Sequence, residues 1–166
     1  MLKKMRALVL LMLLLLLVPG VYGYDNSKSG VFVSLVPGIA YNGTLQVNPD
    51  GSSYQTFTIS VPEDAFGLRV FVEESEADID LYLLYGKEIS SYKEADYGSS
   101  KDDWNEEITV SRFSDPPLRT GTYYLDVAYL LSETPVINGK RLSEISFTLY
   151  IELIIPKVQR RLTPGL

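Results

Sequence analysis

Four closely spaced acidic residues offer the clearest metal chemistry in this sequence. Glu74 and Glu76 precede Asp78 and Asp80. In a strand, Asp78 and Asp80 share one face with their Cα atoms about 6–7 Å apart. Oxygen donors gathered in this way suit Ca²⁺, which takes six to eight of them. We therefore predict a calcium site at these four residues. In the alternative interpretation, Asp78 caps a turn and Asp80 pairs with a Lys or Arg.

Five aromatic residues are candidates for binding a polymer, because aromatic rings pack on sugars and on fibrous proteins. Residues 86–105 form the longest segment without a strand pattern, although a short strand is compatible with residues 88–92. Tyr82 and Tyr124 fall opposite the apolar stripes of their strands, so we expect both to point outward. The alternative is that these aromatics only cover the edge of the core. The candidates are Tyr82, Tyr92, Tyr97, Trp104 and Tyr124.

The chain contains no cysteine and no histidine. Ser-His and Cys-His nucleophile pairs are therefore excluded, and so are the usual zinc sites. A pair of carboxylates could cleave a glycosidic bond only if one had a raised pKa within a sugar-binding cleft. We predict no catalytic residue and no enzyme activity, with a small hydrolase kept as an alternative.

The N-terminal residues have the pattern of a secretory signal peptide. Lys3, Lys4 and Arg6 precede an uninterrupted apolar run over residues 7–18. The run is shorter than the roughly 20 residues of a spanning helix, so we predict cleavage after Gly23 and no stable membrane span afterwards. An uncleaved membrane anchor is the alternative. The protein is then secreted, with one domain over residues 24–155 and a basic tail over residues 156–166.

The predicted mature chain is acidic. The leader holds three of the 15 basic residues and none of the 21 acidic ones, which leaves a net charge of −9. This charge argues against nucleic acid and anionic membranes as partners. An acidic surface is compatible with divalent cations and with basic or neutral polymers.

Most of the remaining sequence alternates with period two, as β-strands with one buried face do. Gly, Pro, Asn and Asp separate the strands, and Asn42–Gly43 predicts a tight turn, although Asn42 also fits a glycosylation acceptor pattern. Short strands at this spacing predict an all-β fold, an antiparallel β-sandwich of about eight strands. The alternating segments are residues 31–36, 54–61, 68–73, 78–85, 107–110, 122–131 and 144–154.

Three segments and a closing strand together resemble the bacterial and archaeal pre-peptidase C-terminal domain. They are Ser53-Tyr54-Gln55-Thr56-Phe57-Thr58-Ile59, Asp78-Ile79-Asp80-Leu81-Tyr82-Leu83, Gly121-Thr122-Tyr123-Tyr124-Leu125-Asp126-Val127 and Phe147-Thr148-Leu149-Tyr150-Ile151. The resemblance covers roughly residues 40–152. It implies a jelly-roll-like sandwich without catalytic activity, usually attached after the catalytic domain of a secreted peptidase.

Domains of this family are removed during maturation, assist secretion or bind insoluble substrates. The related collagen-binding domains of collagenases also bind calcium. Because no peptidase domain precedes the module here, we expect a stand-alone role. The expected partner is an extracellular protein, a polysaccharide or a secreted peptidase. The alternative is a structural or interaction subunit of a cell-surface assembly that pairs through an exposed sheet edge.

Overall fold

The computed structural model describes residues 32–48, 53–101, 105–130 and 135–156. The chain divides into two units, Met1–Gly30 and Val31–Leu166, and every described strand belongs to the second. The predicted signal peptide lies outside the described residues, as does the predicted tail beyond Pro156. No helix in the described part of the chain is long and apolar enough to cross a membrane.

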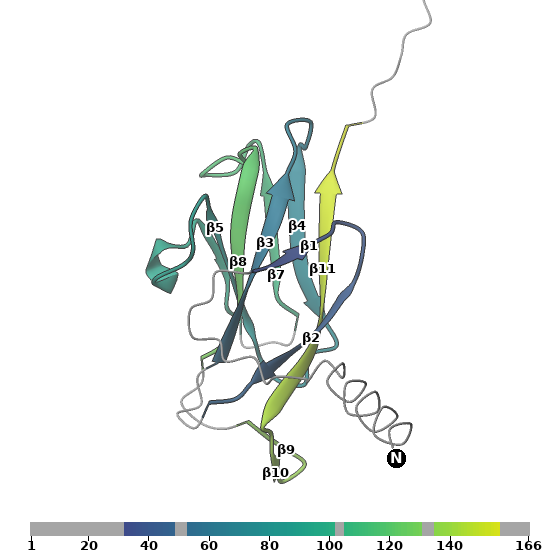
Figure 1. Ribbon diagram of the computed structural model, residues 1–166, viewed down its shortest axis with the longest axis vertical. Coiled ribbons are helices and arrows are strands. Elements are labelled where there is room, and N and C mark those ends of the chain that lie inside the picture. Colours follow the sequence, from purple (N-terminus) through teal and green to yellow (C-terminus); the bar gives the residue numbers. More distant parts are fainter. Residues whose placement is uncertain (1–31, 49–52, 102–104, 131–134, 157–166) are drawn as a thin grey trace, which may run out of the picture. The chain divides into compact units, whose positions relative to one another are not determined.

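Two β-sheets pack face to face in the second unit (Figure 1). The five-stranded sheet contains, in spatial order, β1 (Val33–Leu35), β3 (Ser53–Val61), β8 (Gly121–Tyr129), β5 (Asp80–Tyr85) and β6 (Tyr97–Ser99). The four-stranded sheet contains β2 (Tyr41–Gln46), β11 (Glu144–Ile154), β4 (Gly67–Glu73) and β7 (Glu107–Ser111). A small hairpin of β9 (Val136–Ile137) and β10 (Lys140–Arg141) pairs only with itself among the described strands.

The strand order is that of a jelly roll. Strands β2–β8 and β11 are divided between the sheets in the spatial orders β2-β11-β4-β7 and β3-β8-β5-β6, and every pairing among these eight is antiparallel. Eight strands in two packed sheets define this architecture. Strand β1 adds a short parallel pairing at the outer side of β3. The predicted all-β, jelly-roll-like sandwich of about eight strands is therefore confirmed.

The core consists of the inward side chains that the alternation predicts. Phe57, Leu125 and Leu83 follow one another across β3, β8 and β5 in register, and all three are fully buried. Phe147 of β11 faces them from the opposite sheet, with its ring centroid 6.4 Å from that of Phe57. The hydroxyl of the buried Tyr123 accepts a hydrogen bond from the Arg119 N–H at 2.9 Å, so its polar end is satisfied.

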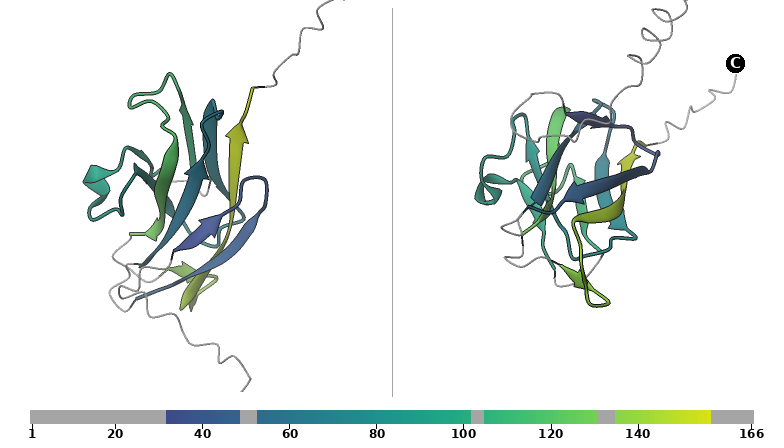
Figure 2. Two further views of the ribbon diagram at one scale, coloured as in Figure 1. Left: turned by 45° about the horizontal axis from the view of Figure 1, so that its top comes forward. Right: turned by 60° about the horizontal axis from the view of Figure 1, so that its bottom comes forward.

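The predicted turn at Asn42–Gly43 is wrong, because both residues lie inside strand β2. The views in Figure 2 show β1 and β2 as successive strands, and their pairings place one in each sheet. Gly43 pairs with Phe147, and a Cβ atom at Gly43 would lie 2.5 Å from the Phe147 ring. This glycine therefore serves close packing rather than a turn.

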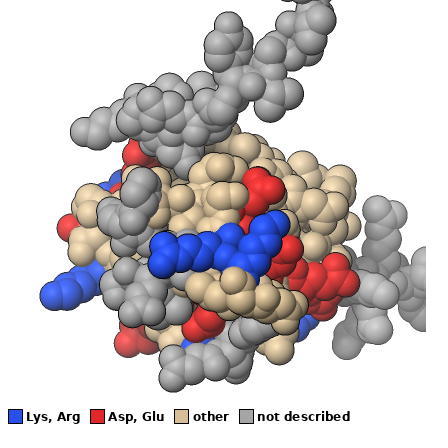
Figure 3. Space-filling model, turned by 90° about the horizontal axis from the view of Figure 1, so that it is seen from below, with Lys and Arg blue, Asp and Glu red and all other residues tan. Residues whose placement is uncertain are grey.

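Two short features were not predicted in their observed places. The irregular segment contains a 3₁₀ turn, η2 (Tyr92–Glu94), and its strand is β6 rather than a strand at residues 88–92. The hairpin of β9 and β10 was missed altogether. Figure 3 shows the lower end of the domain, where a central group of basic side chains borders acidic side chains and uncharged residues surround them.

Candidate ligand-binding face

The outer face of the five-stranded sheet brings together several predicted site residues. Across this face, Thr56 of β3, Asp126 of β8 and Tyr82 of β5 lie side by side in register. Gly98 of β6 continues the row, and a Cβ atom there would lie only 3.3 Å from the Tyr82 ring. The missing side chain at Gly98 thus leaves room for the ring beside it.

The segment between β5 and β6 folds against this face. Its turn η2 stacks the ring of Tyr92 on that of Tyr82, with centroids 4.2 Å apart and planes 27° apart. The end of the segment is anchored by Asp96, which accepts hydrogen bonds from the Tyr85 N–H at 3.0 Å and the Arg119 guanidinium at 2.8 Å. These contacts fix the position of Tyr92 relative to the strands.

The first buried carboxyl of this face is that of Asp126. Only 2% of its surface is exposed although it points away from the core of the sandwich. Its carboxylate accepts a hydrogen bond from the Thr56 hydroxyl at 2.7 Å. Burial raises the pKa of Asp126 to about 6, because a charged carboxylate loses hydration there.

Asp80 is the second carboxyl of the face. Burial raises its pKa to about 6, and the charges of Asp78 and Glu106 add to the increase. A hydrogen bond from the Tyr82 hydroxyl at 3.2 Å acts in the opposite direction. Within the described residues, neither Asp80 nor Asp126 forms an ion pair with a Lys or Arg. Among the described Lys and Arg side chains, none forms the ion pair considered as the alternative role of Asp80.

The two stacked tyrosines keep their hydroxyl protons. Burial, together with the nearby carboxylate of Asp80, raises the pKa of Tyr82 to about 12. Burial and the charge of Asp126 also raise the pKa of Tyr92 above its ordinary value. At neutral pH the face thus offers phenolic donors, aromatic rings and carboxylate acceptors within one small area.

The predicted aromatic candidates divide into three groups. Tyr124 lies on the same outer face, where its ring meets that of Phe32 edge-on at 5.5 Å. Tyr97 does not join the face: it pairs with the inward Leu83, packs against the core and donates its hydroxyl to the Pro116 carbonyl. Trp104 lies outside the described residues.

One residue of this face was missed from the sequence. Tyr54 of β3 is 49% exposed, and its charge interaction with Tyr92 places the two near each other. Its position opposite the apolar stripe of Phe57, Ile59 and Val61 was the available signal. We call Tyr54, Tyr82, Tyr92 and Tyr124 the tyrosine face.

The predicted calcium ligands are not gathered into one group. The described residues contain no cluster of three or more Asp or Glu side chains placed to hold a metal ion. Glu76 accepts a hydrogen bond from the Ser146 N–H at 2.9 Å, which lowers the pKa of Glu76, and Glu74 adopts a left-handed backbone with φ of 56°. Asp78 and Asp80 interact electrostatically. Calcium binding stays a prediction.

Known proteins resemble this chain in sequence and in fold. Residues 53–128 match the family described as the bacterial pre-peptidase C-terminal domain. The crystal structure of the pre-peptidase C-terminal domain of collagenase from Bacillus anthracis superposes with a TM-score of 0.50 at 12% identity. The superposition covers 76% of this chain and all of that domain. No curated protein matches the chain.

At 12% identity the superposition shows a similarity of fold alone. The family match shows a similarity of sequence from β3 to β8. The family match contains the three segments within residues 53–127 that suggested the family, and the closing strand lies beyond it. The resemblance of this β-sandwich to the bacterial pre-peptidase C-terminal domain is therefore confirmed, by sequence over residues 53–128 and by fold over most of the chain.

Proposed function

We propose that this chain is a secreted, non-catalytic β-sandwich module that binds an extracellular macromolecule through its tyrosine face. The stacking of Tyr92 on Tyr82 beside the carboxyls of Asp80 and Asp126 is the observation that supports this most. Rings that are held in place lose little conformational entropy on binding, which favours affinity.

The extent of the face favours a polymer over a small molecule. Tyr54 lies opposite Ala128, and Tyr124 lies four residues further along β8. At about 3.3 Å per residue, these two tyrosines are separated by roughly 13 Å along the sheet. A protein strand or a polysaccharide chain can contact rings over this length, whereas a single sugar ring cannot.

The family resemblance supports the setting of the proposal. The matched domain is named for its association with peptidases, and the superposed domain belongs to a collagenase. We propose that this chain likewise serves a secreted peptidase, by holding a polymeric substrate or by binding the peptidase itself. The predicted signal peptide fits an extracellular location.

Sedimentation with insoluble polymers tests the proposal. The purified chain is mixed with collagen fibrils or with insoluble cellulose, and the bound fraction is measured against polymer concentration. Tyr54→Ser and Tyr124→Ser should each weaken binding about three- to tenfold, since an aromatic contact is worth roughly 0.5–1.5 kcal/mol. Tyr150→Ser is the matched control, because Tyr150 stacks on Phe71 on the outer face of the other sheet.

The proposal fails if Tyr54→Ser and Tyr124→Ser both bind the polymers as the unchanged chain does. Binding that survives both substitutions would favour contact through a sheet edge, which these substitutions leave intact.

A further inference from the structure

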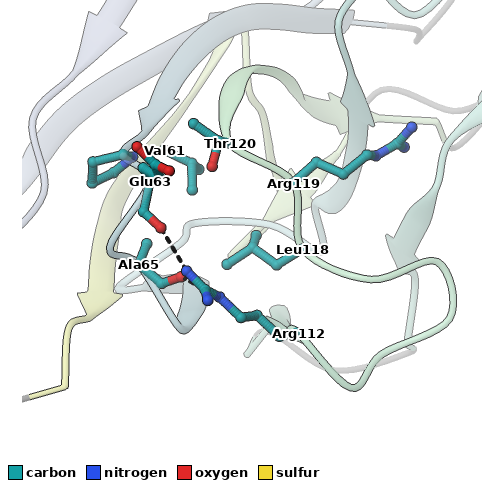
Figure 4. A pocket seen from close by; sticks show the side chains of 8 residues that line it. Val61, Glu63, Ala65, Arg112, Leu118, Arg119 and Thr120 are labelled. Carbon is teal, nitrogen blue, oxygen red and sulfur yellow. Dashed lines mark hydrogen bonds between the residues drawn. The ribbon is translucent and has the colours of Figure 1, made fainter.

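A cavity of about 340 Å³ opens at one end of the sandwich, between the β3–β4 and β7–β8 connections (Figure 4). The buried side chains of Val61, Ala65 and Leu118 lie behind its lining, whose accessible surface is mainly polar. Arg112 and Arg119 also line it, in a chain whose net charge is −6. Two arginines in one cavity of an acidic protein suggest a ligand of opposite charge.

Arg112 is held in place without a carboxylate. Its Nε donates to the Ala65 carbonyl at 3.0 Å, and its Nη2 donates to the Glu63 carbonyl at 2.5 Å. In the described part of the chain, Arg112 takes part in no ion pair. A guanidinium has five N–H donors, so the two carbonyls leave three donors and the full positive charge for a ligand.

Arg119 has a different role in the same wall. Its guanidinium pairs with Asp96 at 2.8 Å and lies 4.2 Å from the centre of the Tyr85 ring. Figure 4 shows it turned away from Arg112. Its charge is already balanced by Asp96. Arg112 is therefore the cation of this cavity that is available to a ligand.

An exposed apolar surface adjoins the cavity beside Arg112. Phe113 is 84% exposed, and its ring meets that of Phe66 edge-on at 5.5 Å. The N–H of Phe66 donates a hydrogen bond to the carbonyl of Ile154. The residue Ile154 is itself half-exposed. Exposed apolar side chains grouped beside a polar site are typical of surfaces that bind another protein.

We propose that the cavity and the Phe113 surface dock a segment of a partner protein in which an acidic side chain is flanked by apolar ones. The carboxylate would accept hydrogen bonds from Arg112, and the apolar side chains would cover Phe113 and the adjoining Phe66. Guanidinium–carboxylate pairing is strong and directional, and a fixed arginine loses little entropy on binding. The exposed Glu63 at the rim disfavours polyanions such as nucleic acid.

This site shares no residue with the tyrosine face, so the failure of one proposal would not affect the other. The probe is the peptide acetyl-Ser-Leu-Glu-Phe-Ser-amide, compared with the same peptide carrying Gln in place of Glu. Binding to the purified chain is followed by two-dimensional amide NMR. We expect shifts in residues 62–66 and 112–120 with the acidic peptide and much smaller shifts with the neutral one.

Three variants separate the contributions to binding. Arg112→Gln should weaken binding about tenfold, the loss of roughly one charge-assisted hydrogen bond. Phe113→Ser should weaken it about threefold, and its exposure makes a folding defect unexpected. Arg141→Gln removes one positive charge from the exposed β10 and should leave binding unchanged. The NMR spectrum of each variant establishes that it is folded.

The proposal is overturned if the acidic peptide at millimolar concentration shifts neither of the two connections. Equal binding of the acidic and neutral peptides would overturn the role of Arg112. An equal loss in Arg112→Gln and Arg141→Gln would show that only the overall charge matters, which also contradicts a specific site.

Discussion

The ring of Tyr92 lies on the ring of Tyr82, with 4.2 Å between their centroids. One ring comes from the turn η2 and the other from strand β5, so this contact joins an irregular segment to the sheet. The carboxyls of Asp126 and Asp80 are electrostatically coupled to Tyr92. The stacked pair thus links the aromatic surface of the domain to its two carboxyls of raised pKa.

Replacing Tyr92 should destabilise the fold. Tyr92→Ser removes a partly buried ring and its stacking contact, so we expect the free energy of unfolding to fall by about 1–3 kcal/mol. Urea denaturation followed by circular dichroism measures this change. Lys93→Ser, at the neighbouring exposed position of η2, is the control and should change stability by less than about 0.5 kcal/mol. Equal effects of the two substitutions would contradict the structural role of the stacked pair.

Stability should be greatest near pH 4. The pKa values of Asp80 and Asp126 are about 6 in the folded chain, above their ordinary value of 3.8. The folded state therefore binds more protons than the unfolded state between about pH 4 and 6, and stability falls as pH rises through this range. Arg69 lowers the pKa of Glu107 to about 2, so that ion pair stabilises the fold above about pH 4.5 and is lost below it. Urea denaturation from pH 3 to 8 would contradict this account if stability rose steadily toward pH 8.

Asp126→Asn should remove part of this pH dependence. The amide oxygen can still accept the Thr56 hydrogen bond, while no buried charge forms at neutral pH. We expect the free energy of unfolding at pH 7.5 to rise by about 1–3 kcal/mol, with little change at pH 4. Asp64→Asn, at an exposed turn between β3 and β4, is the matched control. A loss of stability at pH 7.5 in Asp126→Asn would show that its carboxylate is stabilising.

Gly43→Ala tests the reason why an Asn-Gly pair lies inside a strand. The added methyl group would lie 2.5 Å from the Phe147 ring, so we expect a loss of about 1–3 kcal/mol from overpacking. Phe147→Leu makes space at the same point, and the double variant should lose less stability than the sum of the two single variants. Additive losses would contradict the direct contact.

We predict from the sequence that Asp78 and Asp80 bind calcium. If it is correct, excess Ca²⁺ should raise the melting temperature relative to chelator, because a ligand of the native state stabilises it. Asp80→Asn should abolish this difference, whereas Asp64→Asn should keep it. The same melting temperature with calcium and with chelator would contradict the site.

The strands and the core were predictable because alternation reports burial directly. The stripes of β3, β8 and β11 are buried as expected, including Phe57, Leu125 and Leu149. The turn prediction at Asn42–Gly43 was wrong because glycine is required both in a tight turn and where a ring packs closely on a strand. Only the partner strand, which carries Phe147, shows which of these two reasons applies. Strand β6 has only three residues, which is too short for an alternating pattern to show. It is a strand because it pairs with β5.

The candidate site was predictable only in part. The outward direction of Tyr82 and Tyr124 follows from parity, and both lie on the outer face. That Tyr92 would return to stack on Tyr82 depends on the path of the segment over residues 86–96, which no local pattern encodes. No sequence pattern showed that the strand pairing of Tyr97 turns it toward the core, away from the other candidates.

Chemical protection of tyrosines tests the proposed binding face most directly. The chain is nitrated with tetranitromethane alone and in the presence of collagen fibrils, and each tyrosine is quantified by mass spectrometry. Bound polymer should slow nitration of Tyr54 and Tyr124 several-fold and leave Tyr150, on the outer face of the other sheet, unchanged. Equal nitration of Tyr54 with and without bound polymer, or protection of Tyr150 alone, would contradict the tyrosine face as the binding surface.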